Sequence, residues 1–395
     1  MRVALVTQFF PPETLAGANR VAAIAEALGS GELLTVVAPE PSYPDASVYR
    51  SYEPPTLPPG VQLRRISSFE SQRRVWFARA SAEAWMGIRL AGIAARARPD
   101  VIVASSPSMF LGPPSLAAAR ARSARFIWDL RDLTWEYGKE GDVIAGRLAR
   151  GALRALARIM WSTARRSDLI VCATDGLAIA VRERLPRHRV EVVRNGIDSS
   201  LFATFDPTPP ATSARTRVLY AGLIGHAQAL ETLVEVAAHA PDLELVLAGD
   251  GPLRAPLQAL SVERGLGNIS FTGYISPAEL VRLYHGSDVL FAQLRRSRLH
   301  AVTAAPSKLL EYMAAARPIV YAGEGSAASM IDTVGAGVVV QPDDARAAID
   351  AIRRLASPEG MEMGARGRAY VDSLPSRAEE MSRFASLVAE FGRKP

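Results

Sequence analysis

The amino-acid sequence predicts an α/β protein of two Rossmann-like domains, each built on a doubly wound parallel sheet. Short runs rich in valine, isoleucine and leucine alternate with alanine-rich stretches of helical length, which is the pattern of parallel strands joined by helices. A stretch rich in proline, threonine and serine interrupts this alternation at residues 206–216, and the alternation then restarts. A chain of 395 residues is also longer than one ordinary core supports, and it fits two domains.

The predicted strands fall into two sets. In the first half they are Val3–Thr7, Leu33–Ala38, Val101–Ala104, Phe126–Leu130, Leu169–Ala173 and Val190–Val193. In the second half they are Val218–Ala221, Leu243–Ala248, Ile269–Thr272, Val289–Ala292, Pro318–Ala322 and Gly337–Val340. We place one domain at residues 1–200, a second at 201–374, and a final helical segment at 375–395 that we expect to pack back on the first domain. Ligands of such sheets bind beyond the carboxyl ends of the strands, so we expect the chemistry in post-strand loops facing a cleft between the two sheets.

The composition is that of a globular protein, with 49% hydrophobic and 22% charged residues. No apolar stretch reaches about 18 residues and the first residues lack a signal-peptide layout, so we expect a cytoplasmic protein. Cys172 lies in an apolar run and is expected to be a buried thiol rather than a nucleophile.

The chain has a net charge of +6, because 46 lysines and arginines oppose 40 acidic residues. This excess fits phosphates, anionic lipid or nucleic acid as partners. We expect no nucleic-acid binding, since the arginines are not interleaved with aromatic platforms and no RNA- or DNA-binding motif occurs. We also predict no bound metal, because His188, His226, His239 and His285 lack the spacing of a metal cluster.

Two glycine-containing turns follow predicted strands of the second half. One contains Gly222 and Gly225, and the other contains Gly249 and Gly251 followed by a proline that can open a helix. Glycine allows backbone amides to approach a ligand, but a plain strand-to-helix turn also uses it, so neither turn identifies a cofactor. His226, next to the first turn, is a candidate ligand contact, and a loop histidine without a role is the alternative.

The segment 304–314 predicts a helix N-terminus that binds an anion. Proline precedes Ser307 and Lys308, and free amides at such a terminus attract phosphate. Glu311 follows Lys308 by three positions and lies on the same helical face, so one turn could hold a diphosphate and a ribose. The alternative is an ordinary helix cap with an exposed Lys308–Glu311 pair worth about 0.3 to 0.5 kcal/mol.

The whole chain resembles glycosyltransferase family 4 of the GT-B fold, and in particular its bacterial polysaccharide and lipid-linked glycan branch. The segments that carry the resemblance span both halves in a specific order. They are Phe9-Phe10-Pro11-Pro12-Glu13 with Gly17, Asp129-Leu130-Arg131-Asp132, Asn195-Gly196-Ile197-Asp198 with Phe202, Tyr220-Ala221-Gly222, Ala248-Gly249-Asp250-Gly251-Pro252, Phe271-Thr272-Gly273-Tyr274 and Pro306 to Ala314.

The resemblance implies a transferase that takes a sugar from a nucleotide diphosphate, by analogy UDP, with retention of anomeric configuration and without a metal or other cofactor. Glu311 is then expected to bind the donor ribose, and Ser307 with Lys308 to meet the diphosphate. Tyr274 matches the place where the nucleotide base packs. Gly17 lies on the N-domain loop that approaches the donor phosphate, and Asp132 matches the acidic residue near sugar and acceptor. Such a mechanism depends on electrostatic stabilisation more than on a strong base.

This sequence departs from the family pattern at four positions. Thr303 replaces the first glutamate of the paired-glutamate motif, which contacts the donor sugar. Leu223 and Gln228 replace an arginine and a lysine that bind the diphosphate. We therefore expect Lys308, and next the loop with Arg295, Arg296, Arg298 and His300, to neutralise the phosphates. Arg131 replaces a histidine and can stabilise negative charge but cannot act as a base. We interpret these changes as a variant active site; the alternative is a non-catalytic nucleotide-sugar or polyanion-binding protein.

One predicted helix, 146–166, suggests a membrane-facing surface. At 3.6 residues per turn its basic stripe contains Arg147, Arg150, Arg154, Arg158 and Arg165 together with Trp161, and Leu153, Leu156, Ile159 and Met160 fall opposite. The segment 73–98 adds Trp76, Phe77, Trp85, Arg89 and Arg96. A basic face with aromatic residues suits anionic lipid headgroups, so we predict peripheral association with the inner face of the membrane and a glycan or polyprenyl-linked acceptor. A solvated arginine face is the alternative.

Overall fold

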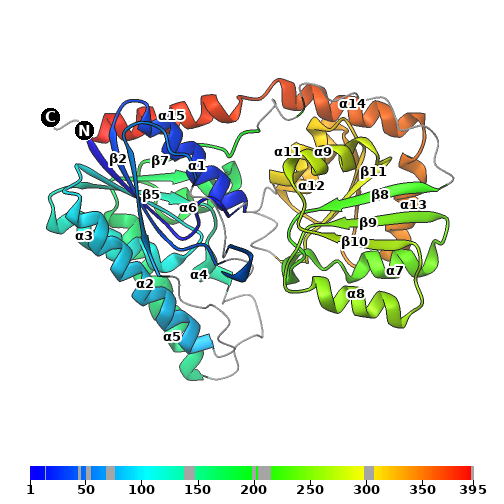
Figure 1. The fold of residues 1–395 in the computed structure, drawn as a ribbon, viewed down its shortest axis with the longest axis horizontal. Coiled ribbons are helices and arrows are strands. Elements are labelled where there is room, and N and C mark those ends of the chain that lie inside the picture. The colour runs from blue at the N-terminus through cyan, green and yellow to red at the C-terminus, as the bar shows by residue number, and fades with distance from the viewer. Residues whose placement is uncertain are drawn as a thin grey trace. The chain divides into compact units, whose positions relative to one another are not determined.

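The computed structural model describes residues 1–13, 15–42, 46–49, 55–67, 76–137, 147–197, 202, 215–297 and 307–392. The chain divides into two compact units (Figure 1). Unit 1 comprises Met1–Asn195 and Arg377–Pro395, and unit 2 comprises Gly196–Ser376. Each unit contains one all-parallel sheet with helices packed on it, which confirms the predicted α/β fold class.

The sheet of unit 1 has the strand order β3-β2-β1-β4-β5-β6-β7. Its strands are β1 (Arg2–Thr7), β2 (Leu33–Pro39), β3 (Val61–Ile66), β4 (Val101–Ser105), β5 (Arg125–Leu130), β6 (Leu169–Cys172) and β7 (Val190–Val192). All but β3 are predicted from the sequence. β3 lies at the sheet edge, where its residues alternate between partly buried and exposed, so it lacks the continuous apolar run of a strand buried on both faces.

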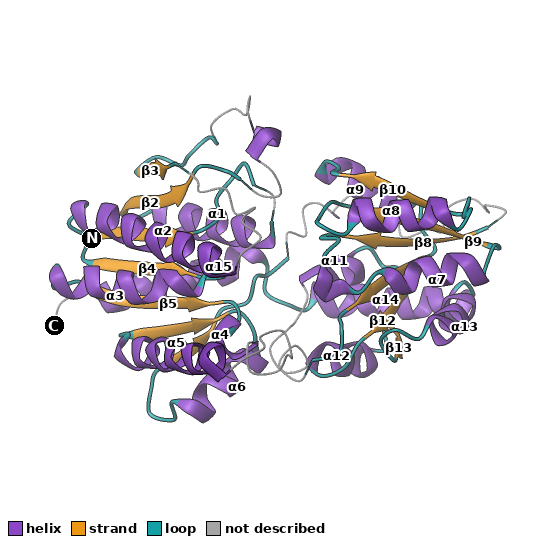
Figure 2. Ribbon diagram, turned by 90° about the horizontal axis from the view of Figure 1, so that it is seen from below, coloured by secondary structure: helices purple, strands orange, loops and turns teal. Residues whose placement is uncertain are grey.

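The helices of unit 1 form two groups. They are α1 (Ala16–Gly29), α2 (Trp76–Arg96), α3 (Gly112–Ala121), α4 (Thr134–Tyr137), α5 (Arg147–Arg166), α6 (Asp175–Arg184) and α15 (Arg377–Gly392), with 3-10 turns η1 (Ala46–Tyr49) and η2 (Met109–Leu111). α1 and the C-terminal helix α15 pack together over a core that contains Leu5, Ile24, Val103, Ile127 and Phe384. α2, α3 and α5 lie side by side as a second helical layer (Figure 2).

The sheet of unit 2 has the strand order β10-β9-β8-β11-β12-β13. Its strands are β8 (Thr216–Ala221), β9 (Leu243–Ala248), β10 (Ile269–Gly273), β11 (Val289–Gln293), β12 (Ile319–Ala322) and β13 (Gly337–Val340). Each coincides with one of the strands predicted for the second half, and only Pro318 of these predicted strands lies outside. This agreement follows from the burial of most of these strands, whose apolar runs are continuous.

Helices cover both faces of this second sheet. They are α7 (Glu231–His239), α8 (Arg254–Glu263), α9 (Pro277–His285), α11 (Ser307–Ala314), α12 (Ser326–Val334), α13 (Ala345–Leu355) and α14 (Pro358–Asp372), with a 3-10 turn η4 (His226–Gln228). One core contains residues of α7, α8 and α13, and the other contains residues of α9, α11 and α12. Within the described ranges, no helix combines the length and the apolar character needed to cross a membrane.

Candidate active site

The glycine turns at the carboxyl ends of β8 and β9 pack backbone against backbone. The amide of Gly222 donates to the carbonyl of Ala248 over 2.8 Å. A Cβ on Gly249 would collide with the carbonyl of Gly222, and a Cβ on Gly251 would lie 2.5 Å from the carbonyl oxygen of Ile224. Both glycines also have positive φ values, of 130° and 153°. The fold therefore requires Gly249 and Gly251 at these positions, and the predicted donor contact of Gly251 stays a prediction.

Lys308, in the first turn of α11, lies over the β8 turn. Its Nζ donates to the Tyr220 hydroxyl over 2.7 Å and lies 4.2 Å from the centre of the Tyr220 ring. A Cβ on Gly222 would lie only 2.8 Å from this Nζ. Burial lowers the pKa of Lys308 to about 8, and the Glu311 carboxylate acts in the opposite direction. The structure thus brings together Gly222, Lys308 and Glu311 at one edge of the sheet.

Two buried tyrosines hold this part of α11 in place through hydrogen bonds. The Tyr312 hydroxyl accepts a hydrogen bond from the Ala221 amide over 2.8 Å and lies 3.2 Å from the carbonyl oxygen of Phe291, at the ends of β8 and β11. The Tyr284 hydroxyl donates to Glu311 Oε2 over 3.3 Å. Burial raises the pKa of Tyr284 well above its usual value and Glu311 adds to this shift, so the hydroxyl stays protonated. These contacts position Glu311 relative to the glycine turn.

The remaining predicted donor residues surround the same edge or lie outside the described residues. Tyr274 follows β10 and is 61% exposed, which leaves its ring available for stacking. His226 is exposed in η4, and Gly225 is buried beside Gln228. Ser307 begins α11, but its side chain is not described. Thr303, Arg298 and His300 lie outside the described residues.

The arginines after β11 have acidic partners. Arg296 lies 2.9 Å from Glu324, and Arg295 lies 3.8 Å from Glu231. Exposed pairs of this kind are weak, at about 0 to 1 kcal/mol, so they leave both guanidinium groups able to exchange partners. Lys308, held beside the glycine turn, is the better placed of the predicted phosphate ligands.

Unit 1 contains a buried ion pair at the carboxyl end of β5. Arg20 and Asp129, 1% and 0% exposed, form two hydrogen bonds of 2.7 and 3.1 Å. The Ser105 hydroxyl also donates to Asp129 over 2.7 Å, and Arg20 donates to Asn195 over 3.1 Å. The sequence prediction missed Arg20, although it quoted Asp129 and Asn195 in motif segments. This network fixes the strand end from which Arg131 and Asp132 extend.

Arg131 and Gly17, both predicted site residues, are in direct contact. A Cβ on Gly17 would collide with Nη1 of Arg131, so glycine allows the guanidinium to lie against the first turn of α1. The Arg131 amide donates to the Ser106 hydroxyl over 2.9 Å. Burial lowers the pKa of Arg131, and repulsion from Arg20 adds to this shift. The structure therefore places a guanidinium beside the α1 N-terminus, in surroundings that disfavour its positive charge.

Asp132 is a partly buried acid with incomplete hydrogen bonding. Burial raises its pKa to about 6, while Arg131 acts in the opposite direction. In the described part of the chain, Asp132 Oδ1, Arg131 Nε and Thr134 Oγ1 are buried without a hydrogen-bond partner. Buried polar atoms are normally paired, and a perturbed acid with unpaired neighbours is typical of a functional site.

Two family models match the chain, and together they cover most of it. Glycosyltransferase Family 4 matches residues 18–201, and Glycosyl transferases group 1 matches residues 206–370. The chain belongs to the glycosyltransferases, its first half matching Family 4 and its second half group 1. Both models describe transferases, which supports an enzyme of this class.

The transferase is similar to bacterial enzymes of polysaccharide assembly. It is 32% identical to O-antigen chain mannosyltransferase C of Escherichia coli over 142 residues, and this match covers 35% of this chain and 36% of that protein. It is 26% identical over 287 residues to the putative colanic acid biosynthesis glycosyl transferase WcaI of Escherichia coli K12, covering 66% of this chain and 67% of that protein. The chain thus spans about a third of the first relative and two thirds of the second.

Solved structures confirm the GT-B fold of the transferase. Sucrose-phosphate synthase from Thermosynechococcus elongatus superimposes with a TM-score of 0.74 at 17% identity, covering 99% of this chain and 98% of that one. Anabaena Alr3699/HepE, solved with UDP and glucose, gives a TM-score of 0.71 at 13% identity, covering 98% and 99%.

Two residues of α5 in the transferase differ from the expectation in their exposure. Trp161 was predicted on the exposed arginine stripe of α5, but it is 6% exposed. Its Nε1 donates to Glu136 over 2.7 Å, and its ring meets Trp135 edge-on at 5.7 Å. Ile159, predicted on the apolar face, is 52% exposed. The prediction is therefore wrong at Trp161, which contact with α4 buries, and at Ile159, whereas Met160 of the predicted apolar face is buried as expected.

The structure describes the side chains of three of the five arginines in the predicted stripe on α5. Arg154, Arg158 and Arg165 are exposed, as predicted. The side chains of Arg147 and Arg150 lie outside the described residues, as do those of Trp76 and Phe77 at the start of α2.

Proposed function

We propose that the transferase moves a sugar from a UDP-linked donor, with retention of anomeric configuration and without a metal, to a glycan or lipid-linked acceptor of cell-surface polysaccharide. The observation that carries the proposal is the grouping of Gly222, Lys308 and Glu311 at the carboxyl ends of β8 and β11. Support for the nucleotide comes from HepE, whose structure holds UDP and glucose. Support for the acceptor class comes from the named relatives of polysaccharide assembly.

The donor is proposed to bind unit 2 through three groups. The diphosphate lies at the Gly222 turn beside Lys308, the Glu311 carboxylate accepts hydrogen bonds from the ribose hydroxyls, and the base stacks on the exposed Tyr274 ring. Lys308 supplies positive charge where the leaving diphosphate gains negative charge, which lowers the barrier to bond cleavage.

The acceptor and the transferred sugar are proposed to meet Arg131 and Asp132 of unit 1. The leaving diphosphate accepts the acceptor proton on the face from which it departs, so configuration is retained. Arg131 stabilises the developing negative charge, and Asp132 orients hydroxyl groups through its unpaired Oδ1.

Titration calorimetry with UDP, GDP and ADP tests the donor assignment. We expect UDP to bind with a dissociation constant between about 1 μM and 1 mM, with the same affinity in magnesium and in EDTA. The other two nucleotides should bind more weakly. Preference for GDP or ADP would overturn the choice of nucleotide, and loss of binding in EDTA would overturn metal independence.

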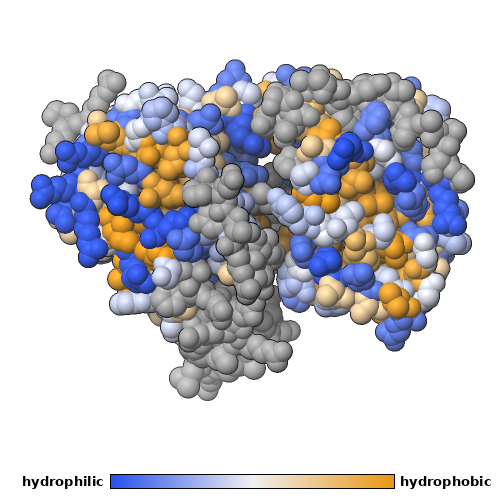
Figure 3. Space-filling model, in the orientation of Figure 1, coloured by the Kyte–Doolittle hydropathy of each residue, from blue (hydrophilic) through white to orange (hydrophobic). Residues whose placement is uncertain are grey.

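An anionic membrane surface is the proposed location of the acceptor. The layer of α2, α3 and α5 carries the single acidic residue Glu83, which accepts a hydrogen bond from Ser108. Its exposed apolar residues are Trp85, Ile88 and Ile159, each more than half exposed. Over these helices Figure 3 shows apolar residues interspersed with hydrophilic ones. The described arginines of the layer are Arg89, Arg96, Arg120, Arg154, Arg158, Arg165 and Arg166.

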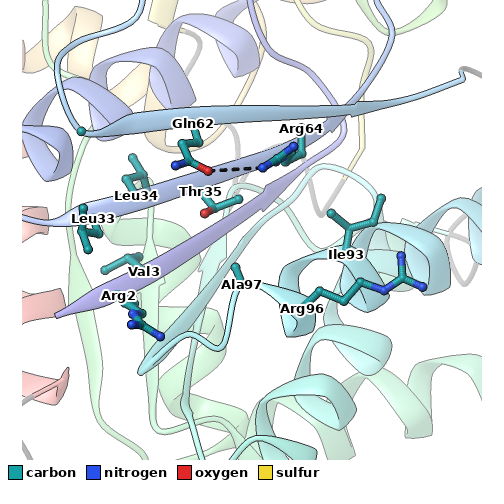
Figure 4. Close-up of a pocket in the computed structure, with 11 residues that line it drawn as sticks. Arg2, Val3, Leu33, Leu34, Thr35, Gln62, Arg64, Ile93, Arg96 and Ala97 are labelled. Carbon is teal, nitrogen blue, oxygen red and sulfur yellow. Dashed lines mark hydrogen bonds between the residues drawn. The ribbon is translucent and has the colours of Figure 1, made fainter.

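A basic groove extends this surface at the end of α2. Arg2, Arg64 and Arg96 line a groove of about 440 Å³, together with Leu33 and Ile93 (Figure 4). Leu33 is 63% exposed, and Arg64 contacts the neutral Gln62. Apolar residues flanked by arginines suit the boundary between lipid headgroups and acyl chains.

Vesicle flotation tests this location. The double variant Arg154→Gln/Arg158→Gln is expected to bind phosphatidylglycerol vesicles roughly 30-fold more weakly, since each basic residue contributes about 1 kcal/mol near an anionic surface. The matched control is Arg353→Gln/Arg354→Gln, which removes the same charge from α13 of unit 2. Equal binding by both variants, or a wild-type protein that stays unbound, would contradict the membrane proposal.

A further inference from the structure

The turn after β8 has no cationic side chain of its own. It runs Gly222, Leu223, Ile224 and Gly225, and Leu223 projects with 38% of its surface exposed. A diphosphate at this turn needs positive charge, because burying phosphate oxygens without a partner is unfavourable. In the described residues, the ammonium beside the turn is that of Lys308, which comes from a helix 86 positions later in the chain, the interval from 222 to 308.

Tyr220 connects this lysine to the turn. Its hydroxyl accepts a hydrogen bond from Lys308 Nζ over 2.7 Å and donates one to the Leu223 carbonyl over 2.5 Å. Its ring lies under the ammonium, 4.2 Å from Nζ. Tyr220 is fully buried in β8, so its own position is fixed by the core.

Lysine needs such a contact because its side chain is long and flexible. An unrestrained ammonium on four methylene groups loses conformational entropy when it binds a ligand. A ring below it and a hydroxyl beside it restrict the ammonium before the ligand arrives. Glycine at position 222 leaves room for it, since a Cβ there would lie 2.8 Å from Nζ.

We propose that Tyr220 is a positioning residue that holds the Lys308 ammonium over the Gly222 turn, where it supplies the donor diphosphate with the charge that the turn lacks. The inference rests on the proposed function, because it assigns the phosphate-binding group of that same donor site. It also accounts for Leu223 in the place of an arginine: the cation comes from α11 and is directed to the turn by a tyrosine of β8.

Tyr220→Phe tests this role, since it retains the buried ring and removes both hydrogen bonds. We expect UDP to bind the variant about five- to tenfold more weakly, which is less than the full effect of one hydrogen bond to a charged group, because Tyr220 acts through Lys308. The affinity of the wild type for UDP should decline as pH rises through about 8, because Lys308 loses its proton there. In the variant this decline should occur at lower pH, because the ammonium has lost its hydrogen-bond acceptor.

A double-mutant cycle separates positioning from packing. In a Lys308→Ala background, Tyr220→Phe is expected to have no further effect on UDP affinity, because the residue acts through Lys308. The matched control is Tyr321→Phe, which removes a hydroxyl from another buried tyrosine of the same sheet. Losses that multiply in the double variant, or a loss equal to that of the control, would overturn the proposal.

A second measurement needs no nucleotide, so it distinguishes failure of this inference from failure of the proposed function. The chain has three lysines, Lys139, Lys308 and Lys394, whose acylation rates by acetic anhydride can be followed separately by peptide mass spectrometry. We expect Tyr220→Phe to acylate faster at Lys308 and unchanged at Lys139. An unchanged rate at Lys308 would refute positioning by Tyr220 even if UDP binds. A faster rate in a protein that binds no UDP would support positioning and refute the donor assignment.

Discussion

Glu311→Ala is expected to weaken UDP binding by about a hundredfold or more. A carboxylate that accepts hydrogen bonds from two ribose hydroxyls contributes about 1.5 to 3 kcal/mol for each bond, and alanine removes both. Glu311 lies one turn after Lys308 on α11, so the two side chains are placed to bind adjacent parts of one nucleotide. Calorimetry with UDP measures the loss directly.

Two comparisons separate this binding role from the folding role of Glu311. Alanine leaves the buried Tyr284 hydroxyl without its acceptor, which costs about 1 to 3 kcal/mol of folding stability, whereas Glu311→Gln retains an oxygen for Tyr284. The wild type should prefer UDP over a dideoxyribose analogue, and Glu311→Ala should bind both equally. A folded Glu311→Ala protein with wild-type UDP affinity would disprove the ribose assignment.

The helices and strands could be predicted where a local run of residues along the chain is enough to identify them. Strands buried on both faces appear as continuous apolar runs, and this signal located most of the strands of both sheets. The edge strand β3 was missed because Gln62 and Arg64 interrupt its apolar residues. For α5, whose residues 147–150 have no described side chains, the helix was predicted, but the exposure of Trp161 was predicted wrongly because the tertiary contact with Glu136 is not encoded in helical spacing.

The candidate site could be predicted only where its residues are neighbours in the chain. Lys308 and Glu311 share one helical turn, and Arg131 and Asp132 follow one strand, so spacing brings each pair together. Tyr220 contacts Lys308 across 88 positions, a contact that depends on strand order and helix placement. Arg20 and Asp129 are likewise 109 positions apart. Supporting contacts of this kind cannot be derived from local periodicity.

Asp132→Asn is expected to lower turnover by about two to three orders of magnitude while leaving UDP affinity unchanged. The substitution keeps the shape of the side chain and removes the charge through which Asp132 is proposed to orient hydroxyl groups. UDP affinity should not change, because the proposed nucleotide contacts lie in unit 2. Wild-type turnover should fall as pH drops through about 6, where the Asp132 carboxylate becomes protonated, and the residual activity of the variant should lack this dependence. A fully active variant would exclude Asp132 from the reaction.

The same substitution is expected to stabilise the folded protein although it lowers turnover. A side chain that costs stability and supports activity has a functional rather than a structural role. Burial raises its pKa from 3.8 to about 6, so the carboxylate destabilises the folded state above pH 6, and this penalty disappears below the unfolded value. This rise in pKa corresponds to up to about 3 kcal/mol of the free energy of unfolding. Urea unfolding should show Asp132→Asn to be more stable than the wild type at pH 8 and equal to it below pH 4. A variant that is less stable at pH 8 would show that the carboxylate is paired, which would remove the physical basis for its role at the acceptor.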